Sequence, residues 1–415
     1  MLLTLIAIAL SLFPPKIADG FAVFLTIAFA VVYSNSPYVD LKESVIRDYM
    51  LTLAVSSALT FGNFFGINSY IIAASLLLGD VHFLLRISKL KDMFHKFKGY
   101  GALGFIAVYT VTGLIYFLVY SSVNVLHYTV SYLVLLSLVG SLSTSLMEYA
   151  GDTGILVVLA SATTYLIFTI YAVYTTLQYL AEAFAISFVL SLLSTKAGVA
   201  DESGLLSATI VGTLLIIFTD FRFFIVLLSF YAVGSAATKY MYKAKYEKGI
   251  AEPAGGARGY VNVFSNSLPA LFFAINYGFY GIEAFKLAFV ASIATALGDT
   301  MASEIGKTSD RVYLITNFRR VEPGTNGGIS LKGELAAIAG CLIVAFLSFA
   351  LNLISLKSLP LVFLASFAGV HIDSLLGATL EERGLLTNAG VNFLATLAGG
   401  LICFGICGQR FLFVS

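Results

Sequence analysis

Long apolar segments recur along the whole chain, separated by short polar connections. Most are close to the roughly 17 to 25 residues that a helix needs to cross a bilayer, where a helix also satisfies its own backbone hydrogen bonds. We place these segments at residues 2–14, 20–34, 49–65, 67–87, 99–120, 126–147, 153–174, 177–194, 204–219, 221–240, 260–278, 281–305, 330–352, 359–378 and 389–408. The pattern predicts an all-α polytopic membrane protein with about 13–15 transmembrane helices.

Composition strengthens this prediction. Of the 415 residues, 59% are hydrophobic and 11% are charged, and the mean hydropathy is +0.93, whereas a soluble domain carries about 25% charged residues. The formal net charge of +1 comes with no basic or acidic tail, so no nucleic-acid partner is expected. The first segment lacks the basic region and the cleavage site of a signal peptide and is expected to remain as a short first helix.

Basic residues are distributed unequally between the two sides of the predicted membrane domain. If the N-terminus is cytoplasmic, the even-numbered connections face the cytoplasm and carry all of the 24 Lys and Arg residues except Lys16, Arg222, Lys286, Lys357 and Arg410. The positive-inside rule therefore predicts a cytoplasmic N-terminus. The polar motifs described below fall on the same side, whereas a transporter is expected to place its ionisable groups near the midplane. This asymmetry favours an enzyme that uses a water-soluble substrate from the cytosol on a membrane-soluble one.

The stretch GDTMASEIGK, residues 298–307, places acidic groups at the cytoplasmic end of an apolar segment. Asp299 and Ser303 share one helix face, whereas Glu304 is offset from Asp299 by about 140° on an ideal helix, so joint metal ligation would need distortion or a second metal. Carboxylates at this depth are costly unless they are paired or bind a metal, and hard oxygen ligands beside phosphates suit Mg²⁺. We expect Asp299 and Glu304 to be catalytic metal ligands; two side chains that simply reach for water are the plainer alternative.

A glycine-rich loop, VEPGTNGGIS at residues 321–330, follows that motif. Backbone amides in such turns can form concavities that hold anions, and nearby arginines supply positive charge for phosphates. Taken alone, a flexible connection would account for the loop; beside the acidic motif, a binding site is favoured. The nucleotide- and phosphate-binding residues expected in this region are Ser303, Lys307, Arg319, Gly324, Thr325, Asn326, Gly327 and Gly328.

Further polar residues complete this face. Asp373 lies inside an apolar segment, deep enough to require a partner, and is expected to be a second catalytic acid. The remaining candidate phosphate ligands are Lys196, Lys239, Arg258 and Asn262. The lysines expected to meet lipid headgroups instead are Lys243, Lys245 and Lys248.

Together these motifs resemble the integral-membrane family that includes the plant phytyl-phosphate kinase of vitamin E synthesis and its animal and microbial relatives. The matching stretches, within residues 191–400, are KAGVADESGLLSATIVG, ARGYVNVFSN, GDTMASEIGK, VEPGTNGGISLKGE and HIDSLLGATLE followed by NAGVN. The family commonly has an Asp-Thr-Trp/Met-Ala-Ser-Glu core followed by a Pro-Gly-Thr-x-Gly-Gly loop, and both occur here in that order. The same elements are distantly similar to those of phosphatidate cytidylyltransferases and of dolichol and phytol kinases.

The resemblance implies phosphorylation of an isoprenoid monophosphate to the diphosphate, with Mg²⁺ and with CTP or ATP as the donor, CTP being preferred. By position it implies Asp299, Ser303 and Glu304 as metal and nucleotide ligands, and Lys307 with residues 324–328 as phosphate ligands. Membrane lipids would be further partners, and a homodimer is the assembly considered. Residues 181–415 would form the catalytic module, and residues 1–180 resemble a decayed phytol or dolichol kinase module that is more structural than catalytic.

Other functions remain open from the residues. A cytidylyltransferase would make a CDP-lipid from the same substrates and release pyrophosphate, whereas a kinase releases a nucleoside diphosphate. A transporter of lipid or small solute would use the acidic residues for ion coupling. The clustering of polar chemistry in the loops makes a scaffold without catalytic activity the least favoured of these functions.

Overall fold

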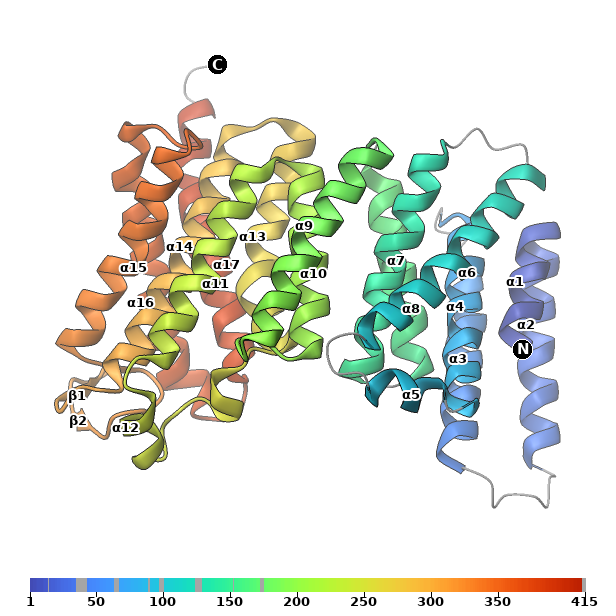
Figure 1. Cartoon of the computed structure of the whole chain (residues 1–415), viewed down its shortest axis with the longest axis horizontal. Coiled ribbons are helices and arrows are strands. Elements are labelled where there is room, and N and C mark those ends of the chain that lie inside the picture. Colours follow the sequence, from blue (N-terminus) through green and yellow to red (C-terminus); the bar gives the residue numbers. More distant parts are fainter. Residues whose placement is uncertain are drawn as a thin grey trace. The chain divides into compact units, whose positions relative to one another are not determined.

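The computed structural model describes residues 1–13, 15–34, 43–62, 67–88, 90–96, 101–123, 129–151, 153–171 and 175–412, most of them in helices (Figure 1). Nine helices in these ranges are long and apolar enough to cross a membrane, and three shorter apolar helices accompany them. Each segment predicted from the sequence overlaps a helix. The predicted fold class, an all-α polytopic membrane protein, is therefore confirmed.

The chain divides into two compact units, Met1–Glu182 and Ala183–Ser415. The N-terminal unit contains the start of α9 and the helices α1 (Leu2–Leu12), α2 (Pro15–Ser34), α3 (Glu43–Thr60), α4 (Ser69–Ile87), α5 (Leu90–Lys96), α6 (Gly101–Val123), α7 (Val130–Ala150) and α8 (Gly154–Tyr171). The C-terminal unit contains the rest of α9 (Leu177–Lys196) and α10 (Glu202–Phe218), α11 (Phe221–Lys239), α12 (Tyr242–Glu247), α13 (Tyr260–Tyr280), α14 (Glu283–Gly306), α15 (Leu331–Ala350), α16 (Leu359–Leu376) and α17 (Asn388–Leu412). It also contains the short 3₁₀ helices η2 (Pro253–Gly256) and η3 (Leu356–Ser358) and the π-helical turn η4 (Gly377–Glu381).

Helix α14 is the central element of the C-terminal unit. It packs against α11, α13, α15, α16 and α17, and every residue from Val290 to Gly298 is buried. Most side chains in this stretch are small (Ala, Ser, Thr and Gly), which lets neighbouring helices approach closely without relying on a hydrophobic driving force inside the bilayer. The last turns of α14 are therefore held in a defined position by several helices at once.

Glycines set the distance between α14 and α15. A Cβ on Gly340 would lie 2.9 Å from the Cα of Gly298, and one on Gly298 would lie 2.6 Å from Cys341 Sγ. Further along the same interface, a Cβ on Gly306 or on Gly333 would lie 3.5 Å from the Cα of the other. The two glycines of GDTMASEIGK thus serve helix packing.

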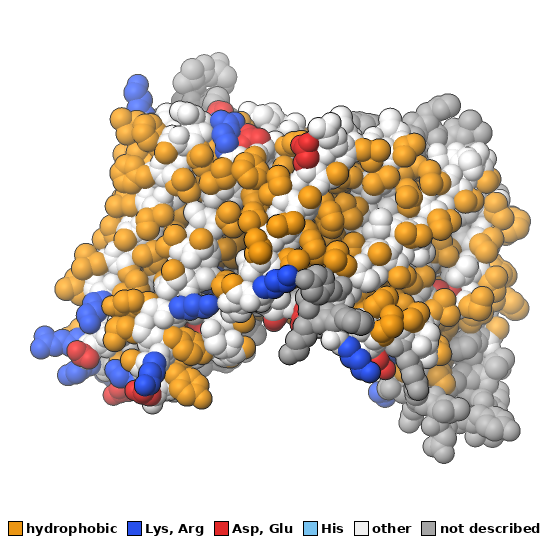
Figure 2. Space-filling view, in the orientation of Figure 1, with side chains coloured by type: hydrophobic (Ala, Val, Ile, Leu, Met, Phe, Trp, Pro, Cys, Tyr) orange, Lys and Arg blue, Asp and Glu red, His pale blue; other side chains and the backbone are white. Residues whose placement is uncertain are grey.

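The connections of the C-terminal unit gather at one end of its helices, which we call the polar end: residues 197–201, 240–259, 307–330 and 377–387 (Figure 1). Lys and Arg side chains surround this end in the face drawn in Figure 2, whereas hydrophobic side chains cover the flanks of the helices. The large apolar surface and the confined charge are what a helical bundle needs in a bilayer.

A small three-stranded sheet forms part of the polar end. Its strands β1 (Val312–Leu314), β2 (Arg320–Val321) and β3 (Gly328–Ile329) are arranged in the order β2–β1–β3, with both pairings antiparallel. From the sequence only a glycine-rich loop was expected here. Strands of two or three residues are too short to show an alternation of apolar and polar positions, so the pattern carried no signal for them.

The contact between α14 and α15 makes one substitution unusually costly. We expect Gly340→Ala to lower the melting temperature of the detergent-purified protein by several degrees, because overpacking of about 1–3 kcal/mol exceeds the gain of about 0.5–1 kcal/mol from replacing a helical glycine. Gly405→Ala in α17 is the matched control, since a Cβ there meets nothing within 4 Å. A thiol-reactive dye that detects exposure of Cys341 on heating measures both. Equal melting temperatures for the two variants would contradict this account of the interface.

Candidate functional site at the polar end

A pair of aspartates forms the first part of the site. Asp299 lies in the last two turns of α14 and Asp373 in the last turn of α16. Their carboxyl groups are within interacting reach of each other, and both are exposed to the negative charge of Glu381. Within the described part of the chain, Asp373 Oδ1 is buried without a hydrogen-bond partner. Two facing carboxylates in a low dielectric repel each other, so this pair needs a cation or a shared proton.

Glu304 faces away from the aspartate pair, towards two lysines. Its Oε2 contacts Lys245 Nζ, and its Oε1 is 2.9 Å from Lys307 Nζ. Lys245 also donates to Thr238 O at 2.8 Å, and Lys307 contacts Glu252 Oε1 at 3.0 Å. These contacts join α11, α12, α14 and the residues before η2 into one ionic network.

The charges of this network stabilise one another. Burial alone would lower the pKa of Lys307, but the carboxylates of Glu304 and Glu252 raise it above its ordinary value. Burial alone would raise the pKa of Glu252, but Lys307 lowers it. Both groups are therefore charged at neutral pH. Each oxygen of Glu304 contacts an ammonium group, so Glu304 is an ion-pair partner of two lysines. These contacts do not support its expected role as a metal ligand.

Two members of this network were missed by sequence reasoning. Lys245 was expected to meet lipid headgroups; this expectation is wrong, because the residue is 1% exposed, whereas Lys243 and Lys248 are exposed. The Lys245 side chain points towards Glu304 because of the left-handed turn at Met241 (φ 48°) that starts α12 and because of the position of α14. Glu252 was not singled out, and the pattern around it contains no feature that would have done so.

The segment from Val199 to Gly204 holds the backbone of Arg258 in place. The Arg258 amide donates to Val199 O at 2.8 Å, and its carbonyl accepts from Asp201 N at 3.2 Å. A Cβ on Gly204 would lie 2.1 Å from Arg258 O, so only glycine fits. Asp201 in turn caps α10 by accepting from Gly204 N at 2.8 Å. The motif KAGVADESG is thus the support of Arg258.

The guanidinium of Arg258 is buried but unpaired. The residue is 9% exposed, and its Cζ lies 5.2 Å from the centre of the Phe230 ring. No side chain or carbonyl in the described ranges forms a hydrogen bond or ion pair with its guanidinium. Burial lowers the pKa of Arg258, and the nearby charges of Glu252 and Glu304 partly offset this. A buried cation with five free donors is costly unless an anion binds it.

The glycine-rich loop lies against the end of α16. A Cβ on Gly327 would lie 2.5 Å from Ser374 O and 2.7 Å from Ala378 N. The loop therefore passes directly beside the turn that carries Asp373. Here α16 continues into the π-helical turn η4, a local irregularity that is frequent at functional sites.

Several amides of this loop are available to a ligand. Gly324 and Gly327 have φ of 91° and 71°, values that glycine adopts without strain. Thr325 Oγ1 is used inside the loop, donating to Glu322 O at 2.7 Å. The amides of Gly324, Asn326 and Gly327 donate to no group that the structure describes. Free amides in consecutive turns form a concavity suited to an anion.

The structure gathers only some of the residues expected from the sequence. Asp299, Asp373, Glu304, Lys307, Arg258 and residues 324–328 lie together at the polar end, as described above. Asn262 is half-buried, and its carbonyl accepts from Asn266 Nδ2 at 2.9 Å. The expected phosphate ligands whose side chains are exposed are Lys196, Lys239, Ser303 and Arg319.

The aspartate pair is the part of the site that fits a metal ion. Among the residues that the structure describes, no group of three or more His, Cys, Asp or Glu side chains forms a metal-binding set. Mg²⁺, however, is commonly held by one or two carboxylates together with water and substrate phosphates. Asp299 and Asp373 supply hard oxygen ligands, and Asp373 Oδ1, which has no hydrogen-bond partner among the described residues, is available to bind a metal. This donor set therefore fits Mg²⁺.

Two acidic residues of the N-terminal unit, Asp80 and Glu148, have partners within its own fold, whereas both carboxyl oxygens of the buried Asp19 have no hydrogen-bond partner among the described residues. Asp80, inside α4, accepts from Thr4 N at 2.8 Å and from Tyr49 OH at 3.0 Å, which caps the start of α1. Glu148 contacts His82 Nδ1 at 2.7 Å and also receives a bond from Tyr109. These contacts give Asp80 and Glu148 a structural role.

The fold and the candidate site define a multi-pass helical membrane protein with ionisable groups clustered at the polar end of its C-terminal unit. The chain belongs to the family of integral membrane proteins DUF92, whose model matches residues 185–400. This confirms the family expected from the motifs. No solved structure matches the chain.

Three relatives illustrate the family. A membrane protein of Synechocystis is 37% identical over 205 residues, covering 48% of this chain and 79% of the relative. One of Methanocaldococcus jannaschii is 34% identical over 215 residues, covering 52% of this chain and 88% of the relative. Protein VTE6 from chloroplasts of Arabidopsis thaliana is 30% identical over 220 residues, covering 51% of this chain and 65% of the relative. The shared region is thus the unit that carries the site.

The ionic network predicts a non-additive effect on stability. Lys245→Met and Glu304→Gln should each lower the free energy of unfolding by about 3–5 kcal/mol, because each leaves a buried charge with fewer partners. The double variant should lose less than the sum of the two. Unfolding in mixed micelles measures the three values, and Lys243→Met, an exposed position on the same short helix, is the control expected within about 0.5 kcal/mol of the parent. Strict additivity would show that the two side chains do not depend on each other.

Proposed function

We propose that the polar end catalyses phosphoryl transfer from a nucleoside triphosphate to a membrane isoprenoid monophosphate, giving the diphosphate. The observation that carries this proposal is that groups suited to two phosphates lie at the same end of a membrane bundle. These groups are an aspartate pair beside free loop amides and a buried arginine without an ion-pair partner. The aspartate pair and the loop amides suit a metal-bound nucleotide, and the arginine suits the acceptor phosphate. The match to VTE6, which falls in the phytyl-phosphate kinase family named above, supports the same activity.

Asp299 and Asp373 would hold Mg²⁺, and Glu304 would keep Lys245 and Lys307 in position instead of binding the metal. When bound, the ion would neutralise charge on the nucleotide phosphates and so favour displacement at the γ-phosphorus. Lys307 stands at the start of the segment that leads to the glycine-rich loop, and its ammonium is charged and held by Glu252 and Glu304. It would bind a phosphate oxygen as a point charge.

The glycine-rich loop would hold the remaining donor phosphates. Its free amides at Gly324, Asn326 and Gly327 provide donors that need no side-chain rearrangement. The donor would be CTP or ATP, with CTP preferred through the family resemblance. Because the positive-inside rule predicts that the basic connections are cytoplasmic, the polar end would face the cytosol, where the nucleotide is available.

Arg258 would hold the acceptor phosphate. A phosphate monoester is its own nucleophile, so one of its oxygens attacks the γ-phosphorus, the bond to the bridging oxygen breaks, and a nucleoside diphosphate leaves. No strong general base is required, which agrees with a site built from cations, carboxylates and amides. Positioning and charge compensation are what these residues would contribute.

Loss of either aspartate tests the metal assignment. We expect Asp299→Asn and Asp373→Asn each to lower the phosphotransfer rate by about 100-fold or more, measured with prenyl monophosphates, Mg²⁺ and labelled CTP or ATP. Both variants should also lose the Mg²⁺-dependent rise in melting temperature of the parent while remaining folded, because removing one charge relieves repulsion. Asp310→Asn, on the exposed surface of the polar end, is the matched control. Full activity in Asp299→Asn would sink the scheme, and release of pyrophosphate would assign a cytidylyltransferase instead.

Arg258 should affect the acceptor more than the nucleotide. We expect Arg258→Gln to raise the KM for the prenyl monophosphate by about tenfold or more, since a charge-assisted bond is worth roughly 1.5–3 kcal/mol, with a smaller change in the KM for the nucleotide. Arg222→Gln, at the opposite end of the C-terminal unit, should leave both constants unchanged. If Arg258→Gln weakened nucleotide binding alone, its assignment to the acceptor would be wrong.

A further inference from the structure

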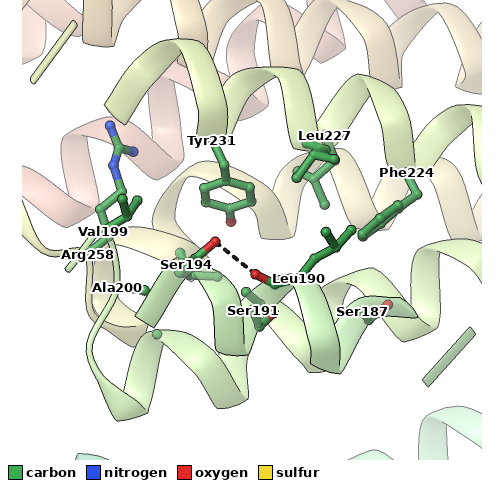
Figure 3. A pocket seen from close by; sticks show the side chains of 14 residues that line it. Ser187, Leu190, Ser191, Ser194, Val199, Ala200, Phe224, Leu227, Tyr231 and Arg258 are labelled. Carbon is green, nitrogen blue, oxygen red and sulfur yellow. Dashed lines mark hydrogen bonds between the residues drawn. The ribbon is translucent and has the colours of Figure 1, made fainter. Parts of the chain in front are cut away.

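A narrow apolar pocket lies inside the C-terminal unit, between α9, α10 and α11 (Figure 3). The pocket is partly open to its surroundings, its enclosed volume is about 50 Å³, and most of its lining is apolar, including Leu190, Leu227 and Val263. Two small residues on α10, Gly204 and Ala208, also line it. Because a cavity that encloses a benzene ring has about 150 Å³, a hydrocarbon chain would lie along the open side of this pocket.

The pocket has a charged end and a closed end. Figure 3 shows Arg258 at one end and Phe224 at the other, with Tyr231 and Leu227 between them. Tyr231, Leu227 and Phe224 are three or four residues apart on α11 and therefore line one face of that helix. The pocket therefore runs along α11 from Arg258, at the polar end, towards Phe224.

The closed end is formed by close contacts. A Cβ on Gly212 would lie 2.7 Å from the Phe224 ring and 2.8 Å from Ser187 Oγ. Phe224 is 5% exposed and Ser187 is 1% exposed. The Phe224 ring therefore packs closely against α9 and α10 at this end of the pocket.

Helix geometry gives the depth of the pocket. Along α9 the lining residues extend from Ser194 to Ser187, which at 1.5 Å per residue is about 10 Å. An extended chain advances roughly 1.3 Å per C–C bond of about 1.5 Å, so the pocket is long enough to contact roughly the first eight carbons of a chain whose phosphate is at Arg258. That is close to two isoprene units.

We propose that this pocket receives the start of a single prenyl chain whose phosphate is bound by Arg258, and that Phe224 sets the chain length beyond which binding no longer improves. The inference rests on the proposed function for the identity of the acceptor. A single-chain isoprenoid phosphate supplies both an anion for the cation of Arg258 and an apolar chain for the pocket wall. Phe224 is a specificity residue in this assignment, and it touches the tail, not the reacting phosphorus.

The test is a series of acceptors of increasing length, given to the full-length protein in nanodiscs. For the parent we expect kcat/KM to rise about tenfold or more from dimethylallyl to geranyl monophosphate, since each buried methylene contributes about 0.8 kcal/mol, and to change little with farnesyl and geranylgeranyl. In Phe224→Ala the rise should continue to farnesyl. In Ser187→Leu, which narrows the same end from another helix, the rise from dimethylallyl to geranyl should be lost.

Phe223→Ala is the matched control. Phe223 is the neighbouring residue on α11, but its ring packs against Phe289, at 4.9 Å between ring centres, and against Tyr277, at 5.4 Å. It should keep the parent's dependence on chain length whatever its effect on stability. The role of Phe224 would be overturned if kcat/KM in Phe224→Ala still stopped rising at geranyl. It would also be overturned if Phe223→Ala extended the rise to farnesyl equally.

A second measurement separates this inference from the proposed function. A geranyl monophosphate carrying a diazirine should label peptides from α9 and α11 on illumination, and farnesyl monophosphate should compete with it. If the parent turns over no acceptor but labels these helices, the kinase assignment fails and the pocket assignment stands. Turnover with labelling confined to other helices would reject the pocket and leave the kinase assignment intact.

Discussion

Compensation of negative charge at the end of a central membrane helix is the constraint on which the polar end depends. Helix α14 carries both Asp299 and Glu304 close to a hydrocarbon environment, where an unpaired carboxylate is costly. Glu304 is compensated by Lys245 and Lys307, which come from different connections. The same contacts therefore hold α12 and the start of the 307–330 segment against the end of α14.

The surroundings of Asp299 differ from those of Glu304. Its carboxyl group interacts with another carboxyl group, Asp373, as well as with the charge of Lys307. An acid that contacts two lysines and an acid that interacts with a second carboxyl group thus lie five residues apart on one helix. Local conflicts of this kind are expected where a ligand completes the structure. Arg258 is a buried cation whose backbone is firmly held, while its guanidinium has no hydrogen-bond or ion-pair partner among the described residues.

Both units contain buried charge. In the N-terminal unit, Asp80 caps α1 and Glu148 is bound to His82 and Tyr109, so these carboxylates contribute to packing. In the C-terminal unit, Asp373 and Arg258 lie at the polar end, where Asp373 Oδ1 has no hydrogen-bond partner among the described residues. The region shared with relatives is the second unit, which agrees with its carrying the ligand-binding chemistry.

The sequence by itself determined the class of protein, the order and approximate bounds of its long helices, and the family, because apolar length and short motifs are properties of contiguous residues. It also located Asp299, Asp373, Arg258 and the glycine-rich loop. Only the tertiary structure decided their partners: that Asp299 interacts with Asp373, that Lys245 is buried against Glu304, and that Arg258 and Phe224 line the same pocket. These relations join residues far apart in the chain, and they depend on how closely α14 and its neighbours pack, which no local pattern encodes.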